Sequence, residues 1–145
     1  MDGVPFLGSQ ALDCGAVTRS QLRTRYRAVF RDVYISRDSE LTAEAKARAA
    51  WLSTGAILAG ISAAAVYGTR WLDGAAPAEI VRADRHGQRG MLVHSYQLTN
   101  DEVRTVWGMP ATTAARTAFD LGRRLPIPEA VPILDALLNA TGIKR

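Results

Sequence analysis

Residues 16–35, AVTRSQLRTRYRAVFRDVYI, contain the strongest structural signals in this chain. Thr18 and Gln21 have the spacing of a capping box, in which each side chain binds a free backbone N–H at the start of a helix. Val17 and Leu22 are spaced to pack across the same start as a hydrophobic staple. The sequence therefore predicts a short helix over Thr18–Arg25.

The segments on either side of this helix complete a familiar order of elements. Upstream, Ser9–Cys14 predicts a short helix closed by Gly15, because glycine tolerates the left-handed turn between two helices. Downstream, Tyr26–Phe30 and Val33–Ser36 are β-prone runs joined by Arg31-Asp32, which predicts a two-stranded wing. This order of elements indicates a winged helix-turn-helix, a DNA-binding motif: a helix, a glycine turn, a capped basic helix and a β-ribbon.

The predicted helix is rich in basic and hydroxyl side chains. Helical spacing places five of them on one face, with Leu22 pointing away: Arg19, Ser20, Arg23, Thr24 and Arg27. For base edges in the major groove we expect Arg19, Ser20, Gln21 and Arg23. For phosphates we expect Arg25, Arg27 and Arg31. The alternative is that this basic face is an ordinary solvent-exposed surface without a binding partner.

Charge and cysteine content narrow the class of protein. The chain has 145 residues and a formal net charge of +4, which favours a polyanionic partner. Its one cysteine, Cys14, cannot form an internal disulfide, which suits a reducing cytoplasm, and we expect it to be a buried free thiol. His86 and His94 are too few to build a zinc site with it. We expect no metal and no cofactor.

Ala49–Gly68 is the one segment long enough to cross a membrane without a charge. It consists mostly of alanine, glycine, serine and threonine, which drive insertion poorly. The segment also divides into the end of a helix that starts at Thr42, a strand over Ala56–Ala59, and a helix capped by Ser62. We therefore predict a soluble core and no membrane partner.

The second half predicts two pairs of strands followed by two helices. Glu79–Ala83 and Met91–Tyr96 flank a loop with four basic residues, Arg82, Arg85, His86 and Arg89. This loop is either a solvated hairpin tip or a second phosphate contact. Val103–Trp107 and Met109–Ala111 form the next pair about Gly108, with Trp107 against the core.

Two helices are expected to close the chain. Thr112 or Thr113 caps the first, on which Arg116 and Asp120 form an i,i+4 pair. Its inward residues are predicted to be Ala115, Ala118, Phe119 and Leu125. The second begins near Pro128, with Pro132 as the alternative start, and ends at Gly142. The fold class is therefore α+β.

Three phrases in this half resemble a known family: GISAAAVYGTRW (60–71), GMPATTAARTAFDLGRRLP (108–126) and EAVPILDALLNATG (129–142). They are similar to the antitoxins of AbiE-type toxin–antitoxin systems, and to related regulators in which a winged helix precedes an AbiEi-like domain. The resemblance implies a winged helix-turn-helix over residues 1–38 and an AbiEi-like mixed α/β domain over residues 39–145. Carried over by position, Thr18–Arg25 is the recognition helix and Tyr26–Ser36 is the wing.

The same resemblance implies a cytoplasmic transcriptional regulator that represses its own operon by binding promoter repeats in double-stranded DNA. The linked toxin of this type is a nucleotidyltransferase-like protein, and toxin and antitoxin act without direct contact. No catalytic residue is carried over, so we expect no enzyme. Longer relatives continue into a domain resembling a very-short-patch-repair-type endonuclease, which we expect this chain to lack. A single small module binds weakly, which predicts a homodimer or cooperative assembly on paired half-sites.

Two other classes of protein remain open from the residues alone. Asp73, Glu79 and Arg82 resemble the acid–acid–base set of a metal-dependent nuclease. However, such a site uses a lysine at the third position, and an arginine does not readily deprotonate. A protein-interaction module without DNA contact is the other alternative.

Overall fold

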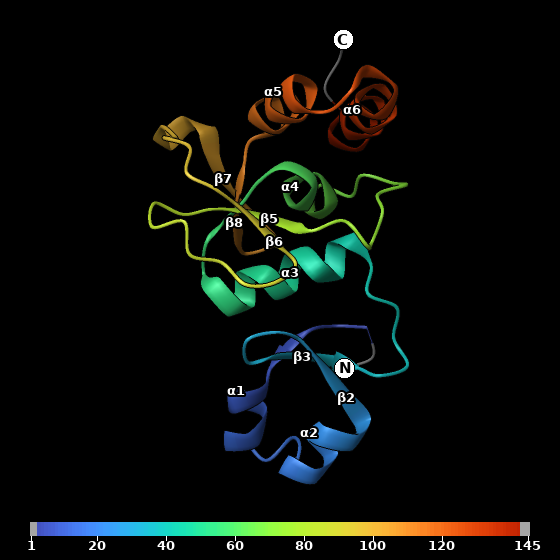
Figure 1. Ribbon diagram of the computed structural model, residues 1–145, viewed down its shortest axis with the longest axis vertical. Helices are drawn as coiled ribbons and strands as arrows, with labels where there is room; N and C mark the ends of the chain where they lie inside the picture. The colour runs from blue at the N-terminus through green and yellow to red at the C-terminus, as the bar shows by residue number, and fades with distance from the viewer. Residues whose placement is uncertain (1–2, 143–145) are drawn as a thin grey trace.

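A computed structural model describes residues 3–142 of the chain (Figure 1). The described chain contains six α-helices, a three-stranded sheet and a five-stranded sheet, which confirms the α+β class. Along the long axis of Figure 1, helices α1 and α2 lie at one end and α5 and α6 at the other.

The N-terminal part follows the predicted order closely. Its elements are β1 (Phe6–Leu7), α1 (Gly8–Asp13), α2 (Arg19–Arg25), β2 (Tyr26–Phe30) and β3 (Val33–Ser36). The strands form an antiparallel sheet in the order β1-β3-β2. The bounds of β2 and β3 are those predicted, and β3 alternates buried and partly exposed positions, as a strand with one face on a core does.

The predicted start of α2 is confirmed. The backbone N–H of Thr18 donates to Gln21 Oε1 at 3.0 Å, and that of Gln21 donates to Thr18 Oγ1 at 3.1 Å. Val17 and Leu22 are both buried in one small cluster with Ala11 of α1. The capping box and staple thus hold α2 against α1.

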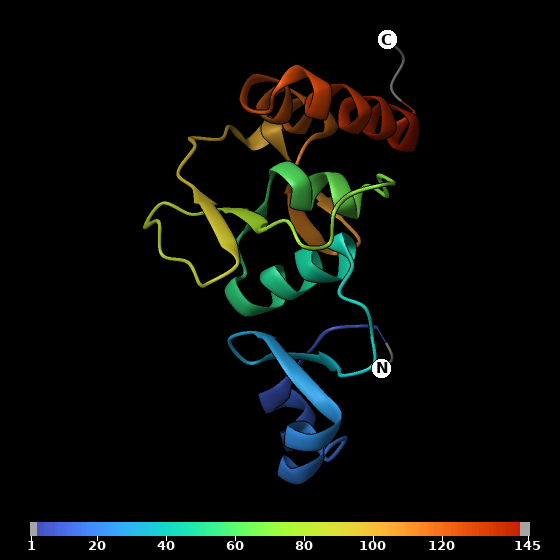
Figure 2. The same cartoon turned by 45° about the vertical axis from the view of Figure 1, so that its right-hand side comes forward.

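The three-stranded sheet packs against α3 (Ala43–Thr54), as both views show (Figure 2). Thr42 caps this helix, and Gly55 ends it with a left-handed φ of 68°. Phe30 and Val33 of the sheet belong to the same hydrophobic cluster as the buried alanines of α3. The core therefore continues across the predicted domain boundary at 38/39.

Beyond α3 lies the five-stranded sheet, in the order β6-β5-β4-β8-β7. Its strands are β4 (Ile57–Leu58), β5 (Ala78–Val81), β6 (Met91–His94), β7 (Val103–Val106) and β8 (Met109–Thr112). The remaining helices are α4 (Gly60–Val66), the 3-10 helix η1 (Asn100–Glu102), α5 (Ala114–Arg124) and α6 (Ile127–Thr141). Helix α4 packs between α3 and α5, so it connects the two ends of the molecule.

The direction of β5 and β6 corrects the predicted hairpin. The two strands are parallel, with Ala78 opposite Met91 and Val81 opposite His94. Each strand is about 13 Å long at 3.3 Å per residue, and the basic loop 82–90 is long enough to run back over that length. This loop is therefore a crossover connection and not a hairpin tip.

Two single-residue predictions in this half were wrong. Ser62 does not cap α4, which begins at Gly60 after Ala59; the buried Ser62 hydroxyl instead accepts the backbone N–H of Glu79 at 2.8 Å. Trp107 does not pack on the core and is 78 % exposed. It occupies the first position of a two-residue turn with Gly108, both at positive φ, which projects its side chain from the hairpin end.

Helix α5 buries a partly different face from the predicted one. Thr113 caps it, as one of the two predicted caps, and Ala118 and Leu125 pack against the apolar cluster of α4–α6 as expected. Ala115 and Phe119 instead face solvent. The buried face is Ala114, Thr117, Asp120 and Leu121, because Thr117 and Asp120 are hydrogen-bonded within it.

The exposure of Cys14 differs from the prediction, and the structure decides between the two predicted starts of α6. Cys14 was predicted to be buried but is exposed, because α1 ends at Asp13 and Cys14 already lies in the turn after the helix. Helix α6 starts at Ile127, close to the first predicted start, and continues through Pro132. Within residues 3–142, no helix has the length and apolar character needed to span a membrane.

Candidate nucleic-acid interface

Helix α2 lies at one end of the molecule (Figure 1), and three of its seven residues are arginines. Arg19, Ser20, Arg23 and Thr24 are exposed on it, whereas Leu22 points inward, as predicted. Arg25 is also exposed at the helix end. Within residues 3–142, no ion pair neutralises an arginine of α2, since the salt bridges there involve other residues. The charges of this helix are therefore available to an anionic partner.

Two polar side chains of α2 are partly used by the helix itself. Gln21 is half-buried, and its Oε1 accepts the backbone N–H of Thr18, so only the amide Nε2 is left to donate outward. The hydroxyl of Thr24 donates to the carbonyl of Ser20 at 2.9 Å. Arg19, Ser20 and Arg23 are consequently the freest polar groups of this face.

Arg27 does not lie on the α2 face, contrary to prediction. The helix ends at Arg25, and Tyr26 already has an extended backbone at φ −125° and ψ 161°. Arg27 therefore belongs to β2, opposite Ile35. Its Nη2 donates to the carbonyl of Ser39 at 3.0 Å, so the side chain is half-buried against the link to α3. The predicted helix end at Arg25 is confirmed, so the error was to extend the helical spacing two residues beyond that end.

Arg31 is also separated from α2. It follows β2 at the end opposite Arg25, so a five-residue strand roughly 17 Å long lies between the two residues. Its backbone N–H donates to Gln88 Oε1 at 2.6 Å, and its carbonyl accepts the Ser53 hydroxyl at 2.8 Å. The predicted wing tip thus contacts α3 and the loop 82–90.

Arg37 joins the α2 group although it was predicted only as part of a polar link. The Nη2 of Arg37 donates to the backbone carbonyl of Arg23 at 2.8 Å. The backbone N–H of Arg37 donates to the backbone carbonyl of Arg25 at 3.0 Å. The register of the β2–β3 hairpin, with Tyr26 opposite Ser36, is the signal that indicates this position. A hollow of about 350 Å³ lies beside it, lined by Thr24, Arg25, Tyr26, Ser36, Arg37 and Asp38.

The acid–acid–base set does not form a nuclease centre. Asp73 and Glu79 both line a hollow of about 420 Å³, but Arg82 does not line it and pairs with Asp84 at 3.3 Å. The carboxylate of Glu79 already accepts the Ile61 N–H at 2.9 Å and an Arg124 N–H at 2.9 Å. In the part of the chain that the structure describes, no cluster of histidine, cysteine, aspartate and glutamate is suited to a metal ion.

Glu79 instead has a structural role at the centre of a buried polar group. Its Oε1 lies 2.8 Å from His94 Nε2, which must donate, because an ionised carboxylate only accepts. Burial raises the pKa of Glu79, but the hydrogen bonds from His94, the Ile61 N–H and Arg124 outweigh it and lower the pKa below its ordinary value.

This lowered pKa predicts acid sensitivity. The unfolded chain takes up a proton near the ordinary glutamate pKa of about 4.3, whereas folded Glu79 stays ionised. Its contribution to stability is therefore present above about pH 4.3 and is lost as the pH falls through the lowered pKa. Urea unfolding of the wild type and of Glu79→Gln between about pH 6 and pH 3 should show a steeper decline for the wild type.

The comparison isolates Glu79 from other acidic groups. Asp84 and Glu102 also have lowered pKa values, chiefly because the backbone N–H groups of His86 and Thr99 donate to them. Asp84 and Glu102 contribute equally to the pH dependence of the wild type and of Glu79→Gln, so their contributions cancel when the two curves are compared. The exposed Glu129 provides the matched control, because Glu129→Gln should keep the wild-type pH dependence. Parallel curves for the wild type and Glu79→Gln would contradict the assignment.

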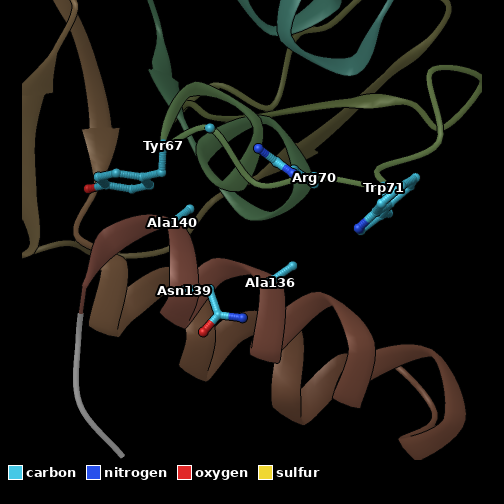
Figure 3. A pocket seen from close by; sticks show the side chains of 7 residues that line it. Tyr67, Arg70, Trp71, Ala136, Asn139 and Ala140 are labelled. Carbon is cyan, nitrogen blue, oxygen red and sulfur yellow. The ribbon is translucent and has the colours of Figure 1, made fainter.

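A further hollow of about 520 Å³ lies between the end of α4 and α6 (Figure 3). Tyr67, Arg70 and Trp71 line one side of it, and Ala136, Asn139 and Ala140 of α6 line the other. The lining residues include one guanidinium and two aromatic rings, but no carboxylate or histidine that could act as a general acid or base. It therefore offers binding surface without catalytic groups.

Comparison with known proteins adds no family assignment. No protein-family model matches this chain, and no match is found among curated proteins. The function is therefore inferred from the surface of α2 and its supports.

Proposed function

We propose that this chain is a DNA-binding transcriptional regulator that inserts α2 into the major groove. The observation that carries the proposal is the exposed, unneutralised basic face of a capped helix held on a buried staple. A seven-residue helix is marginal by itself, so the cap and the contact of Leu22 with α1 are needed to present its side chains in one orientation. The proposed architecture is a winged helix-turn-helix made of α1, α2 and the β2–β3 hairpin.

The side chains divide by what they can reach. Arg19 and Arg23 are four residues apart and project together, with Ser20 between them, so we assign them to base edges. Arg25 and Arg37 lie at the C-terminal end of α2, and we assign them to phosphates. Gln21 and Thr24 are secondary contacts, because part of their hydrogen-bonding capacity is used within the helix.

The AbiE-like phrases support a more specific form of the proposal. In that form the chain is an antitoxin-like autorepressor in the cytoplasm that binds promoter repeats of its own operon beside a linked toxin gene. One module of this size buries little DNA surface, so two copies on paired half-sites are part of the proposal.

Arg23→Ala tests the proposal. Loss of a base contact should weaken binding to the chain's own upstream DNA by about 1–3 kcal/mol, with a smaller loss on scrambled duplex. Fluorescence anisotropy at several salt concentrations measures both affinities. The exposed Arg70, which lines the α4–α6 hollow, supplies the control Arg70→Ala, which should bind like the wild type.

Two outcomes would count against the proposal. Equal losses on cognate and scrambled DNA would remove Arg23 from sequence recognition. No salt-dependent affinity of the wild type for any duplex would exclude DNA binding and favour a protein-interaction module, because phosphate contacts release counterions.

A further inference from the structure

A second basic surface lies away from α2, where the β2–β3 turn meets the five-stranded sheet. It surrounds a hollow of about 510 Å³. The residues that line it are Arg31, Ser53, Thr54, Arg82, Arg85, His86, Gly87 and Gln88. They come from three places in the sequence: the β2–β3 turn, the end of α3 and the loop 82–90. The fold thus brings together basic residues that the sequence keeps far apart.

Neutral polar groups hold the walls of this hollow in place. Gln88 accepts the backbone N–H of Arg31 at 2.6 Å, and its Nε2 donates to the Ser53 hydroxyl at 2.8 Å. The same hydroxyl donates to the Arg31 carbonyl at 2.8 Å. Because these bonds use the backbone of Arg31, its guanidinium is not needed to maintain the wall.

The charged groups of the hollow are positive in excess. Of its three arginines, Arg82 pairs with the exposed Asp84 at 3.3 Å. Arg85 donates from Nε to the neutral Ser95 hydroxyl at 3.1 Å, which orients its guanidinium without neutralising it. Arg31 forms no ion pair among residues 3–142. Two guanidinium charges therefore remain uncompensated beside the His86 imidazole.

The backbone of this loop is also held in an uncommon conformation. Arg85 has a φ of 58°, in the left-handed region that residues other than glycine adopt rarely. Such a conformation persists only where the surroundings over-determine it, and it is frequent at ligand sites. Asp84 helps to stabilise it, because Asp84 Oδ1 accepts the backbone N–H of His86 at 3.1 Å.

We propose that this hollow binds a phosphate group. Guanidinium groups donate pairs of parallel N–H bonds that match phosphate oxygens, and several converging arginines favour a multiply charged anion. The volume is larger than one phosphate needs, so it also accommodates part of the molecule that carries the group. That carrier is either a DNA backbone or a free phosphorylated small molecule, and the binding chemistry is the same for both.

Binding should stabilise the whole chain, since the anion would bridge the N-terminal hairpin and the second sheet. Sodium pyrophosphate is the probe, added to the full chain at constant ionic strength with chloride as the reference. The expected result is a melting temperature that rises with pyrophosphate concentration, as for any ligand of the folded state. Arg31→Gln and Arg85→Gln should each weaken the affinity by about tenfold or more, because each removes charge-assisted hydrogen bonds.

Arg89→Gln is the matched control. Arg89 is an exposed arginine of the same loop but does not line the hollow, so this variant should bind pyrophosphate like the wild type. Circular dichroism and the melting temperature without anion show whether each variant is folded. Should Arg85→Gln fail to fold, Arg31→Gln still tests the proposal, because the bonds that hold its segment come from the backbone.

Duplex DNA of unrelated sequence distinguishes the two carriers. If Arg31→Gln and Arg85→Gln each reduce the salt slope of duplex binding by about 1, the phosphate belongs to the DNA backbone. If they lose pyrophosphate binding but bind duplex normally, the ligand is a free phosphorylated molecule. If Arg31→Gln and Arg85→Gln bind both pyrophosphate and duplex DNA as tightly as Arg89→Gln does, the proposal is overturned.

The result is independent of the proposed role of α2. Arg23→Ala should bind pyrophosphate normally, since Arg23 does not line the hollow. A failure of DNA recognition by α2 would therefore leave pyrophosphate binding intact, and a failure at the hollow would leave cognate DNA binding dependent on Arg23.

Discussion

Glu79→Ala is expected to lower the free energy of unfolding by about 3–5 kcal/mol, the usual effect of removing one partner from a buried ionic group. Glu79 is 2 % exposed, and its carboxylate accepts from Arg124, His94 and the first turn of α4. Alanine leaves all three donors without their acceptor, and of the three side chains in this group only that of Arg124 is substantially open to water. The loss is large because His94 and the Ile61 N–H are largely shielded from water and cannot replace the lost acceptor, whereas Arg124 can be partly rehydrated.

The Glu79 carboxylate packs closely against the backbone of Gly60 at the start of α4. Gly60 has a φ of 51°, and a Cβ at this position would lie only 2.3 Å from Glu79 Oε1. The carboxylate therefore fits against bare backbone at the start of α4, and no neighbouring side chain can replace it there. Gly60→Ala should consequently disturb the same group.

Urea denaturation followed by circular dichroism measures the effect. Glu129→Ala, which removes an exposed carboxylate from α6, is the control and should change stability by less than about 0.5 kcal/mol. A double-mutant cycle with Arg124→Met separates the Glu79–Arg124 interaction from the other two. A loss for Glu79→Ala no larger than that of the control would show that the buried group contributes nothing to stability.

Leu121→Ala is expected to lower the free energy of unfolding by about 2–5 kcal/mol. Leu121 is 0 % exposed and packs with Ala64 of α4 and Leu137 of α6, so it lies where three helices meet. Truncation removes apolar contacts and leaves a cavity, because the buried α4 residue of this cluster is Ala64, whose short side chain cannot fill the space.

The same denaturation experiment checks this prediction, with Val131→Ala as its control. Val131 is an apolar residue of α6 that is 57 % exposed, so its truncation should cost much less. Faster amide exchange in α5 and α6 of Leu121→Ala would show that the contact holds these helices to α4. Equal effects of the two substitutions would contradict the role assigned to Leu121.

Local features of the fold were predictable from the sequence. The α2 capping box joins Thr18 and Gln21, three residues apart, and the bounds of β2 and β3 follow from β-prone runs around a tight turn. Helix α3 begins after Thr42 and ends at Gly55 for the same reason. Each of these signals acts between residues that are neighbours along the chain, so no knowledge of the remaining fold is needed.

Features that depend on distant partners were predicted less well. The parallel pairing of β5 with β6 depends on how the loop 82–90 is held, and Gln88 holds it through Ser53 and the backbone of Arg31. The buried face of α5 depends on Thr112 and on the ion pairs of Asp120. Hydrophobic periodicity does not indicate a buried polar residue whose partners lie elsewhere.

The candidate site divides in the same way. The exposed face with Arg19, Ser20 and Arg23 follows from helical spacing and was predictable. The removal of Arg27 follows from the end of α2 at Arg25, which the sequence also predicted but which was not applied to Arg27. The addition of Arg37 depends on the register of the β2–β3 hairpin, which the sequence did not indicate.

By itself, the sequence determined the two N-terminal helices, the β2–β3 hairpin, the orientation of α2 and the α+β class, because caps, staples and turns act over a few residues; β1 was not predicted. Only the tertiary structure decided that Arg31, predicted at the tip of the wing, lines the same hollow as Arg82, Arg85 and His86. It also decided that Glu79 is a buried structural carboxylate and not a surface acid. The physical reason is that charge clusters and burial arise from contacts between segments far apart in the chain, which local propensity does not encode.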